Sequence, residues 1–208
     1  MLIFKERVLV DKLSDKTKKK YEWLYNKSKK TYGTLFWELN KIYVPFLNAL
    51  PYTTLLDVGC GGGKYLDLLG SQYKKIYGVD WVVEPHVKSK NFHFFKTDAW
   101  DIPLPDKSVD ITISLDFFEH VDPHRLGDVF EEMLRVTKSM MIFKIEITSS
   151  SFNKEGLEKE FGEGEGELHI SQHPLDWWID FFNNYPITSI FSPYTNSLRT
   201  PTSIGIIM

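Results

Sequence analysis

A glycine-rich turn between two apolar segments constrains this chain more than any other feature. The sequence from Leu55 to Leu69 reads LLDVGCGGGKYLDLL, in which an apolar run is followed by Asp57 and then by glycines at 59, 61 and 63. A chain that leaves a buried strand and turns at once into a helix needs backbone angles that favour glycine, and the missing side chains let a ligand approach the main chain. The first amides of the next helix then face that ligand. The segment predicts a strand, a ligand-binding turn and a helix.

The spacing of these glycines argues against a nicotinamide dinucleotide. The dinucleotide fingerprint is Gly-x-Gly-x-x-Gly, but its third position is Lys64 when counting starts at Gly59 and Leu66 when it starts at Gly61. The segment instead resembles the Asp-x-Gly-x-Gly-x-Gly loop of class I S-adenosylmethionine-dependent methyltransferases, especially those with a methyltransferase type-11 domain. This resemblance covers residues 55–147 and leaves the flanks unmatched.

Short apolar runs, separated by turns or helical segments, follow Pro51. This alternation is typical of parallel strands joined by crossovers. Before the last of these strands we expect a helix from Asp122 or Pro123 to Val136, with Asp122 as its N-cap. The expected strands are Thr54–Val58, Lys75–Val79, Phe92–Lys96, Val109–Ser114 and Met140–Ile147.

The last part of the sequence extends this pattern after an interruption. The polar stretch 148–173 is expected to be a mobile surface insertion that could cover a site. Its glutamates at 163, 165 and 167 are expected in solvent, although they could attract a cationic acceptor. A helix over Pro174–Asn183 and two closing strands around Ile187–Phe191 and Ser203–Ile207 follow. We therefore predict the α/β class: a Rossmann-like, doubly wound, mostly parallel seven-stranded sheet with helices on both faces and an N-terminal helical cap.

The segment before the first strand is expected to be helical. Lysines crowd the residues from Asp11 to Lys30, which predict a basic helix, and a second helix is expected from Thr34 toward Asn48, with Pro45 kinking it or marking its last turns. We assign residues 1–50 to the helical cap and 51–208 to the S-adenosylmethionine-binding domain, within one structural domain. The lysines could contact nucleic-acid phosphates, but exposed lysines on a helix are mostly solvated.

The resemblance implies that S-adenosylmethionine is the cofactor and suggests which residues hold it. Asp80 ends the second strand, where an acidic side chain can accept hydrogen bonds from both ribose hydroxyls. Asp98 would bind the adenine amino group, with Ala99 and Trp100 beside the ring. Each acid alone could be only a turn or cap residue, but their order after successive strands favours the cofactor. The predicted cofactor set is Asp57, Gly59, Cys60, Gly61, Asp80, Trp81, Asp98, Ala99, Trp100 and Leu115.

Residues after the fourth strand face the methyl group in the family that this chain resembles. His120 is the candidate catalytic residue, because a neutral imidazole can take a proton from an acceptor hydroxyl near neutral pH. Its alternative role is to pack near the cofactor or orient the loop. Substrate contacts are expected from Glu119, His169, His173 and Trp177. The alternative for the segment ELHISQHPLDWW is a helix N-terminus with one buried tryptophan.

No metal site is expected. The single cysteine, Cys60, excludes an intramolecular disulfide and a thiolate-rich zinc site, and it is interpreted as a small turn residue rather than a nucleophile. His169 and His173 have the spacing of one helical face, but Pro174 argues against a helix there.

These features predict an S-adenosylmethionine-dependent methyltransferase. The methyl group of a sulfonium is already activated, so the protein mainly has to align the acceptor and exclude water. The leading hypothesis is transfer to O or N of a small molecule such as a sugar or another metabolite. One alternative is methylation of nucleic acid or protein, and another is a non-catalytic S-adenosylmethionine-binding or partner-binding module.

Nucleic acid is the less favoured partner, and no membrane partner is expected. The net charge of −3 produces no strong electrostatic field of the kind that attracts a protein to nucleic acid or to a membrane surface. The string SLDFFEH stands where amino-methylating nucleic-acid enzymes carry Asn-Pro-Pro-aromatic or Asp-Pro-Pro-aromatic. The opening MLIFKERVLV is too short for a signal-peptide core, so a cytoplasmic protein is expected. The acceptor and the oligomeric state stay open.

Overall fold

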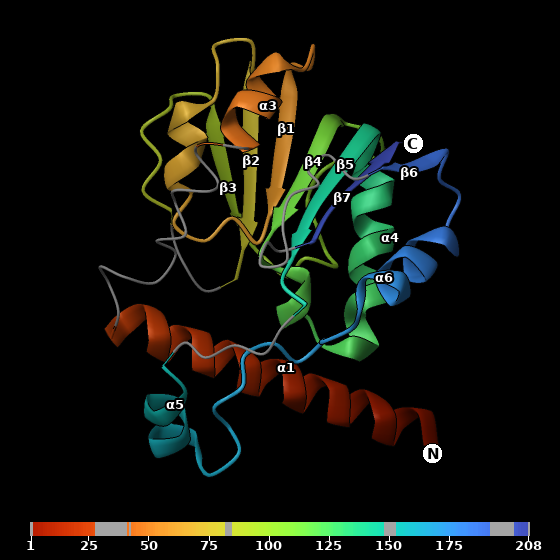
Figure 1. Ribbon diagram of the computed structural model, residues 1–208. Helices are drawn as coiled ribbons and strands as arrows, with labels where there is room; N and C mark the ends of the chain where they lie inside the picture. Colours follow the sequence, from red (N-terminus) through yellow and green to blue (C-terminus); the bar gives the residue numbers. More distant parts are fainter. Residues whose placement is uncertain are drawn as a thin grey trace.

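A central β-sheet organises the protein. The computed structural model describes residues 2–27, 41, 43–81, 85–147, 153–191 and 202–207. The strands lie in the order β3-β2-β1-β4-β5-β7-β6 (Figure 1). Five of them are parallel: β1 (Thr54–Val58), β2 (Lys75–Asp80), β3 (Phe92–Lys96), β4 (Val109–Leu115) and β5 (Thr137–Ile145). Antiparallel to β5 runs β7 (Thr202–Ile207), which pairs in turn with β6 (Ser189–Phe191).

The strand order reverses at β1. This strand lies between β2 and β4, so the chain passes from β1 outward to β3 and then returns to the other side of β1. In open parallel sheets ligands bind outside the carboxyl ends of the strands at such a reversal. The fold therefore directs attention to the ends of β1, β2 and β4.

The parallel part of the sheet confirms the predicted Rossmann-like arrangement. Four strands begin at the predicted residue, and β5 begins at Thr137 rather than Met140. The helix before it ends at Val136, and the Thr137 hydroxyl donates to the carbonyl of Met133 at 2.6 Å, so helix and strand meet without a loop. The polar Lys138 at the strand start conceals this boundary in the sequence.

Helices pack on both faces of the sheet. On one face α3 (Val44–Ala49) and the 3₁₀ helix η2 (Lys64–Leu68) contribute to an apolar core with β1 and β4. On the other face lie α4 (Leu126–Val136) and α6 (Leu175–Asn183). A 3₁₀ turn, η4 (Pro123–Arg125), precedes α4, and the Asp122 carboxylate accepts the amide of His124 at 2.9 Å. Asp122 therefore caps this turn, whereas the α-helix itself begins at Leu126, later than predicted, with Arg125 as its N-cap.

Two local predictions about helices were wrong. The turn after Gly63 leads into η2 rather than into an α-helix, because left-handed Gly63 and extended Leu69 leave only five residues between them. The predicted helix from Thr34 toward Asn48 falls partly on residues 28–40 and 42, outside the described residues. Within the described part, Pro45 stands in the first turn of α3 rather than its last turns, where its fixed φ suits a helix start.

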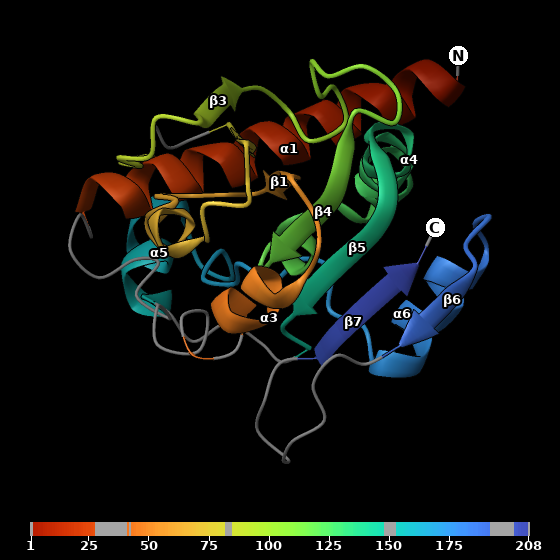
Figure 2. The same cartoon turned by 90° about the horizontal axis from the view of Figure 1, so that it is seen from above.

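The long helix α1 (Leu2–Lys27) lies across the carboxyl ends of the parallel strands (Figures 1 and 2). Behind it packs α5 (Lys154–Phe161), which belongs to the stretch predicted as a mobile insertion. Tyr21 and Leu24 of α1 form a buried cluster with Leu157 and Leu168. The mobile-insertion prediction was therefore wrong, because two leucines among polar residues anchor the stretch to α1. No helix among the described residues has the length and apolarity needed to cross a membrane.

The predicted solvation of the glycine–glutamate run was also wrong in part. Glu165 forms ion pairs with Lys16 at 2.5 Å and with Lys20 at 3.1 Å. The Lys20 ammonium group also donates to the carbonyl of Glu167 at 3.2 Å. Lys20 is buried, so this contact is part of the packing between α1 and the segment that leads from α5 back to the sheet.

Candidate functional site

The glycine loop is tied to the end of β2. The amides of Gly59 and Cys60 both donate to the carbonyl of Val79, at 2.9 and 3.1 Å. The amide of Gly61 donates to Oδ2 of Asp80 at 3.0 Å. The predicted cofactor residues that follow the first and second strands therefore lie together, with the Asp80 carboxylate hydrogen-bonded to the glycine loop.

Gly59 permits a close approach between the loop and the chain after β4. Its φ is 78°, and a Cβ built there would overlap the ring of Phe117. A left-handed backbone disfavours any L side chain, and the ring leaves no space for one. The first glycine of the motif is therefore required by its neighbours as well as by the turn.

Asp57 lies buried beneath the loop. The Tyr65 hydroxyl donates to its Oδ2 at 2.5 Å. Burial raises the pKa of Asp57 from 3.8 to about 7, while the hydrogen bond from Tyr65 lowers it and the charge of Asp80 raises it further. This side chain supports the turn from below, and its predicted contact with the cofactor stays a prediction.

Cys60 is buried in the same turn. Burial is the largest cause that raises the pKa of its thiol, followed by the charges of Asp57 and Asp80. A thiol held protonated is a poor nucleophile, which fits the interpretation of Cys60 as a small turn residue. The buried members of the predicted cofactor set are Asp57, Cys60, Ala99 and Leu115.

Two tryptophans meet at the ends of β2 and β3, where the adenine is expected. The rings of Trp81 and Trp100 lie edge to face with centroids 6.0 Å apart. Lys18 of α1 lies 5.4 Å from the centre of the Trp81 ring, and Arg125 lies 4.8 Å from that of Trp100. Burial raises the pKa of neighbouring Asp98, an effect that the charge of Lys18 opposes. The fold thus gathers the predicted adenine-side residues, and α1 contributes a cation that the sequence did not indicate.

The chain after β4 places two carboxylates side by side. Asp116 has a φ of 55° and forms an ion pair with the buried Lys144 of β5. The next turn, η3 (Phe118–His120), carries Glu119, which is fully buried. Its Oε1 accepts the amide of Glu146 at 3.1 Å, whereas its Oε2 has no hydrogen-bond partner among the described residues. Burial, and then the charge of Asp116, raise the pKa of Glu119 to about 8.

The His120 ring lies between α1 and the segment after α5. Its Nδ1 is 2.5 Å from the hydroxyl of Tyr21 and 3.1 Å from the carbonyl oxygen of Leu168. Burial lowers the pKa of His120 to about 3, and the neighbouring His169 lowers it further. The imidazole is therefore neutral over the physiological range, as a general base or a metal ligand must be.

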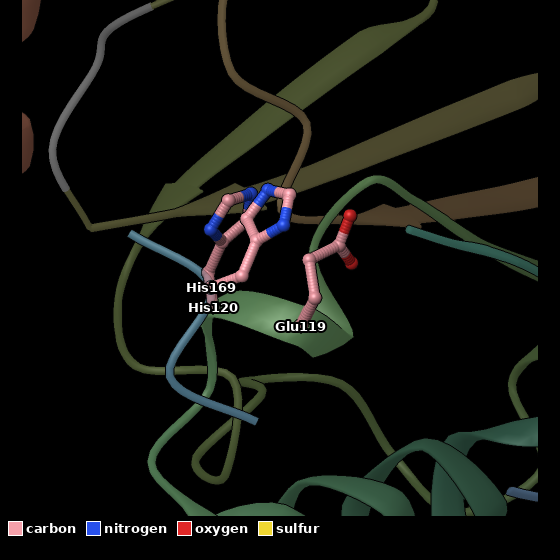
Figure 3. A group of neighbouring side chains, drawn as sticks. All are labelled: Glu119, His120 and His169. Carbon is pink, nitrogen blue, oxygen red and sulfur yellow. The ribbon is translucent and has the colours of Figure 1, made fainter. Parts of the chain in front are cut away.

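Several hydrogen bonds hold His169 over the η3 turn. The amide of Ser171 donates to the carbonyl of Glu119 at 3.0 Å, and its hydroxyl donates to the carbonyl of Val121 at 2.6 Å. The His169 ring consequently lies 4.8 Å from that of His120, centre to centre. One ligand atom from each of Glu119, His120 and His169 lies within 4.8 Å of the others, and all three side chains extend to the same side of the turn (Figure 3).

His173 and Trp177 have different surroundings. Their rings stack at 3.6 Å with an interplanar angle of 13°, next to Trp178 at the start of α6. Trp178 is fully buried in the core, with Pro174 as the N-cap of the helix. This arrangement matches the alternative of a helix N-terminus with one buried tryptophan. The predicted acceptor contacts of His173 and Trp177 stay predictions.

Sequence reasoning missed the two side chains that fix the polar groups after β4. Tyr21 contacts His120 from a helix 99 residues earlier, and Lys144 pairs with Asp116 from the adjacent strand. Tyr21 carried no local signal, because one tyrosine among lysines is typical of any amphipathic helix. Lys144 did carry one: a lysine within the apolar run MMIFKI is costly to bury without a partner.

Comparisons with known proteins agree with this geometry. Residues 56–143 match a family described as a methyltransferase domain. A Mycobacterium tuberculosis protein named a probable S-adenosylmethionine-dependent methyltransferase is 28% identical over 93 residues. An Arabidopsis thaliana tRNA (carboxymethyluridine(34)-5-O)-methyltransferase is 34% identical over 98 residues. These alignments cover 42% and 45% of this chain but only 34% and 24% of the two relatives.

A solved structure extends the likeness to the whole fold. The complex of DhpI with SAH superposes with a TM-score of 0.65 at 12% identity and covers 93% of this chain and 94% of that one. The family match covers the segment from β1 to β5, and the structural match extends across the flanks. Helix α1 and the segment after α5 therefore lie outside the residues that match the family.

Proposed function

Because residues 56–143 form a class I S-adenosylmethionine-dependent methyltransferase domain, we propose that this chain transfers a methyl group to an oxygen or nitrogen atom of a small molecule. S-adenosylmethionine is the cofactor of this domain and supplies an activated methyl group when bound. The loop of Gly59 and Gly61, the carboxylate of Asp80 and the pair Trp81 and Trp100 would hold it.

The observation that supports a small acceptor is the cover over the carboxyl ends of the strands. Tyr21 and Leu24 of α1 pack with Leu157 and Leu168, which joins the helix to α5 and to the segment after it. Figure 2 shows α5 beside α1. His120 contacts this cover from the sheet side through Tyr21. A helix packed over the strand ends limits access to them, which suits a small molecule better than a folded polymer.

The lysines of α1 support this choice over nucleic acid. Two of them, Lys16 and Lys20, share the single carboxylate of Glu165, which neutralises one of their two charges. A third, Lys18, lies over the Trp81 ring. Nucleic-acid binding depends on lysines and arginines that are free to contact phosphates. Lys16, Lys18 and Lys20 instead have partners within the protein.

His120 is the residue that we expect to act on the acceptor. Both of its ring contacts among the described residues involve Nδ1, with Tyr21 and with the carbonyl of Leu168. A carbonyl can only accept, so the contact with Leu168 favours a proton on Nδ1 and a lone pair on Nε2. We propose that Nε2 accepts the proton of an acceptor hydroxyl as the methyl group is transferred, because the oxygen becomes cationic during transfer and then gives up its proton even to a weak base.

The first test is calorimetric titration of the full chain with S-adenosylmethionine and, in parallel, with NAD. We expect the sulfonium compound to bind in the micromolar range and NAD not to bind. Asp80→Ala should weaken binding at least about tenfold, since it removes a charged acceptor of ribose hydrogen bonds. Asp180→Ala, which changes an exposed acid on α6, is the matched control and should leave the affinity unchanged.

The second test is an acceptor screen with S-adenosylhomocysteine as the measured product. The panel contains sugars, small hydroxyl and amine metabolites, total tRNA and a peptide library. Product from a small molecule, reduced by His120→Ala, would support the proposal. Product from RNA or peptide alone would contradict it, and tight cofactor binding without product from any acceptor would favour a non-catalytic module.

A further inference from the structure

We propose that Glu119, His120 and His169 form a binding site for one divalent transition-metal ion at the carboxyl end of β4. The cluster joins parts of the chain that are distant in sequence: the η3 turn supplies two side chains, and the segment after α5 supplies the third (Figure 3). One carboxylate and two imidazoles are a ligand set that such ions favour.

The distances suit an ion after small side-chain movements. One ligand atom from each residue lies within 4.8 Å of the other two. Atoms bound to one tetrahedral ion at about 2.1 Å each lie about 3.4 Å apart, so the widest separation in the cluster would have to contract by about 1.4 Å to close the site. Both imidazoles are only half-buried, which leaves them room for this movement.

The buried carboxylate has an oxygen that needs a partner. Glu119 is fully buried, and its Oε2 has no hydrogen bond among the described residues, although Oε1 accepts the amide of Glu146. A buried polar atom without a partner costs roughly 1–3 kcal/mol, and more when it is charged. A cation beside Oε2 would remove that cost, which gives a reason for the carboxylate to lie there.

The surroundings of His120 resemble those of metal-bound imidazoles. A histidine that binds a metal through one nitrogen usually donates from the other to a carbonyl or carboxylate, which fixes the ring and its tautomer. Nδ1 of His120 is 3.1 Å from the Leu168 carbonyl, so Nε2 is the nitrogen that can bind an ion.

The same segment orders the third ligand. Ser171 donates to the carbonyls of Glu119 and Val121, and these hydrogen bonds hold the segment that carries His169 against the η3 turn. Ligands that are pre-positioned in this way lose less conformational entropy when an ion binds.

The donor atoms indicate the class of ion. Imidazole nitrogens suit Fe²⁺, Ni²⁺, Cu²⁺ and Zn²⁺, whereas Mg²⁺, Ca²⁺ and Mn²⁺ prefer oxygen ligands. The proposal differs from the expectation of a protein without a metal site, which considered only His169 and His173 as a helical pair. The structure separates that pair and joins His169 with His120 instead.

A role for the ion in catalysis rests on the proposed function. An ion bound here would lie on the acceptor side of the site and would lower the pKa of an acceptor hydroxyl that it binds. In the loaded protein His120 would be a ligand of the ion, and the acceptor proton would pass to solvent water instead of to Nε2.

The test is titration of the full chain, stripped with EDTA, with Co²⁺, followed by visible d–d absorption and calorimetry. We expect one Co²⁺ per chain, displaced by Zn²⁺ but not by Mg²⁺. His169→Ala should weaken Co²⁺ binding at least about tenfold, since it removes a ligand. His173→Ala is the matched control, because it removes a nearby histidine outside the cluster, and should leave binding unchanged.

A carboxylate variant checks the buried ligand. Glu119→Gln keeps the size of the side chain and removes its charge, so it should weaken Co²⁺ binding by a similar factor. If Glu119→Gln does not fold, the comparison of His169→Ala with His173→Ala decides alone. Absence of Co²⁺ binding, or equal loss in the two histidine variants, would overturn the proposal.

The outcomes separate this site from the proposed function. Co²⁺ binding requires neither cofactor nor acceptor. Stoichiometric binding without S-adenosylhomocysteine from any acceptor would keep the metal site and contradict the proposed function. Methyl transfer that is insensitive to EDTA, in a chain that binds no Co²⁺, would keep the function and reject the metal site.

Discussion

The hydroxyl of Tyr21 lies 2.5 Å from Nδ1 of His120, across 99 residues of sequence. The two rings also meet edge to face, with centroids 5.3 Å apart. Helix α1 therefore contributes directly to the polar site and is more than a cover over it. Any movement of α1 away from the strand ends would change the partner, and with it the orientation, of the His120 ring.

Replacement of Tyr21 by Phe tests this contact. The phenyl ring can keep its packing against Leu24 and Leu168, so the melting temperature should change by less than about 3 °C. The loss of one hydrogen bond costs about 1 kcal/mol, which corresponds to a rate of methyl transfer roughly fivefold lower. The ¹⁵N chemical shifts of the His120 ring should move, whereas Tyr77→Phe on the sheet should leave them unchanged. Unaltered shifts in Tyr21→Phe would show that the contact does not orient the ring.

Gly59→Ala tests the close approach of Phe117 to the glycine loop. A left-handed backbone costs a non-glycine residue about 1–2 kcal/mol, and the new methyl group would also displace the ring. We expect a fall in melting temperature of at least about 4 °C and loss of S-adenosylmethionine binding. The matched control is Gly62→Ala, because a Cβ at Gly62 meets no atom within 4 Å. Equal stability of the two variants would refute the steric explanation.

The parallel strands and the cofactor loop could be predicted because their signals are local. Buried strands of a parallel sheet are rich in Leu, Ile and Val, and LLDV and VDITISL have these residues at most of their positions. The glycine loop could be predicted because glycines at 59, 61 and 63 are typical of a tight connection from a strand to a helix. All three have positive φ in the structure.

The acceptor side could not be predicted in the same way, because its contacts connect distant segments. His169 meets His120 only because Ser171 binds the carbonyls of the η3 turn, and no spacing in the sequence encodes that contact. The packing of α5 on α1 depends on Leu157 and Leu168, two apolar residues in a polar stretch. Composition made this stretch resemble a flexible loop, whereas tertiary packing determined its structure.

Asp57 should make stability depend on pH. Its pKa is about 7 in the folded protein and 3.8 in an unfolded chain, so the folded state holds its proton over a range in which the unfolded state has lost it. The stabilisation from this difference is complete below about pH 4 and is lost as the pH rises through about 7. Ionisation of the buried carboxylate therefore works against folding in weakly alkaline solution.

Asp57→Asn should remove this dependence while it keeps the hydrogen bond from Tyr65. We expect the variant to gain stability relative to the wild type as the pH is raised from 5 to 8. Thermal unfolding of both cofactor-free proteins across that range measures the difference, and Asp180→Asn on the exposed face of α6 serves as the control. A difference in melting temperature that is constant with pH would contradict a raised pKa at Asp57.

The guanidinium of Arg135, in the last turn of α4, binds the loop that follows β3 through hydrogen bonds and ion pairs. It donates to the carbonyls of Ile102 and Leu104 at 2.9 and 2.8 Å, and it forms ion pairs with Asp106 and Glu132. The Glu132 carboxylate accepts the amide of Ile102 at 2.8 Å, which closes the network. Since Asp98 and Trp100 lie at the start of this loop, the network also positions the residues predicted to bind the adenine.

Arg135→Ala should destabilise the fold and release this loop. It leaves two carbonyls and the carboxylate of Glu132 without their donor, and we expect a loss of about 2–3 kcal/mol, or roughly 5–10 °C in melting temperature. Lys138→Ala breaks the pair with Asp110 at the surface, where such pairs contribute about 0–1 kcal/mol, and is the control. Hydrogen exchange should quicken across residues 97–106 in Arg135→Ala alone, and S-adenosylmethionine should bind more weakly. Unchanged exchange in that segment would mean that Ile102 and Leu104 are held by their apolar contacts rather than by the guanidinium.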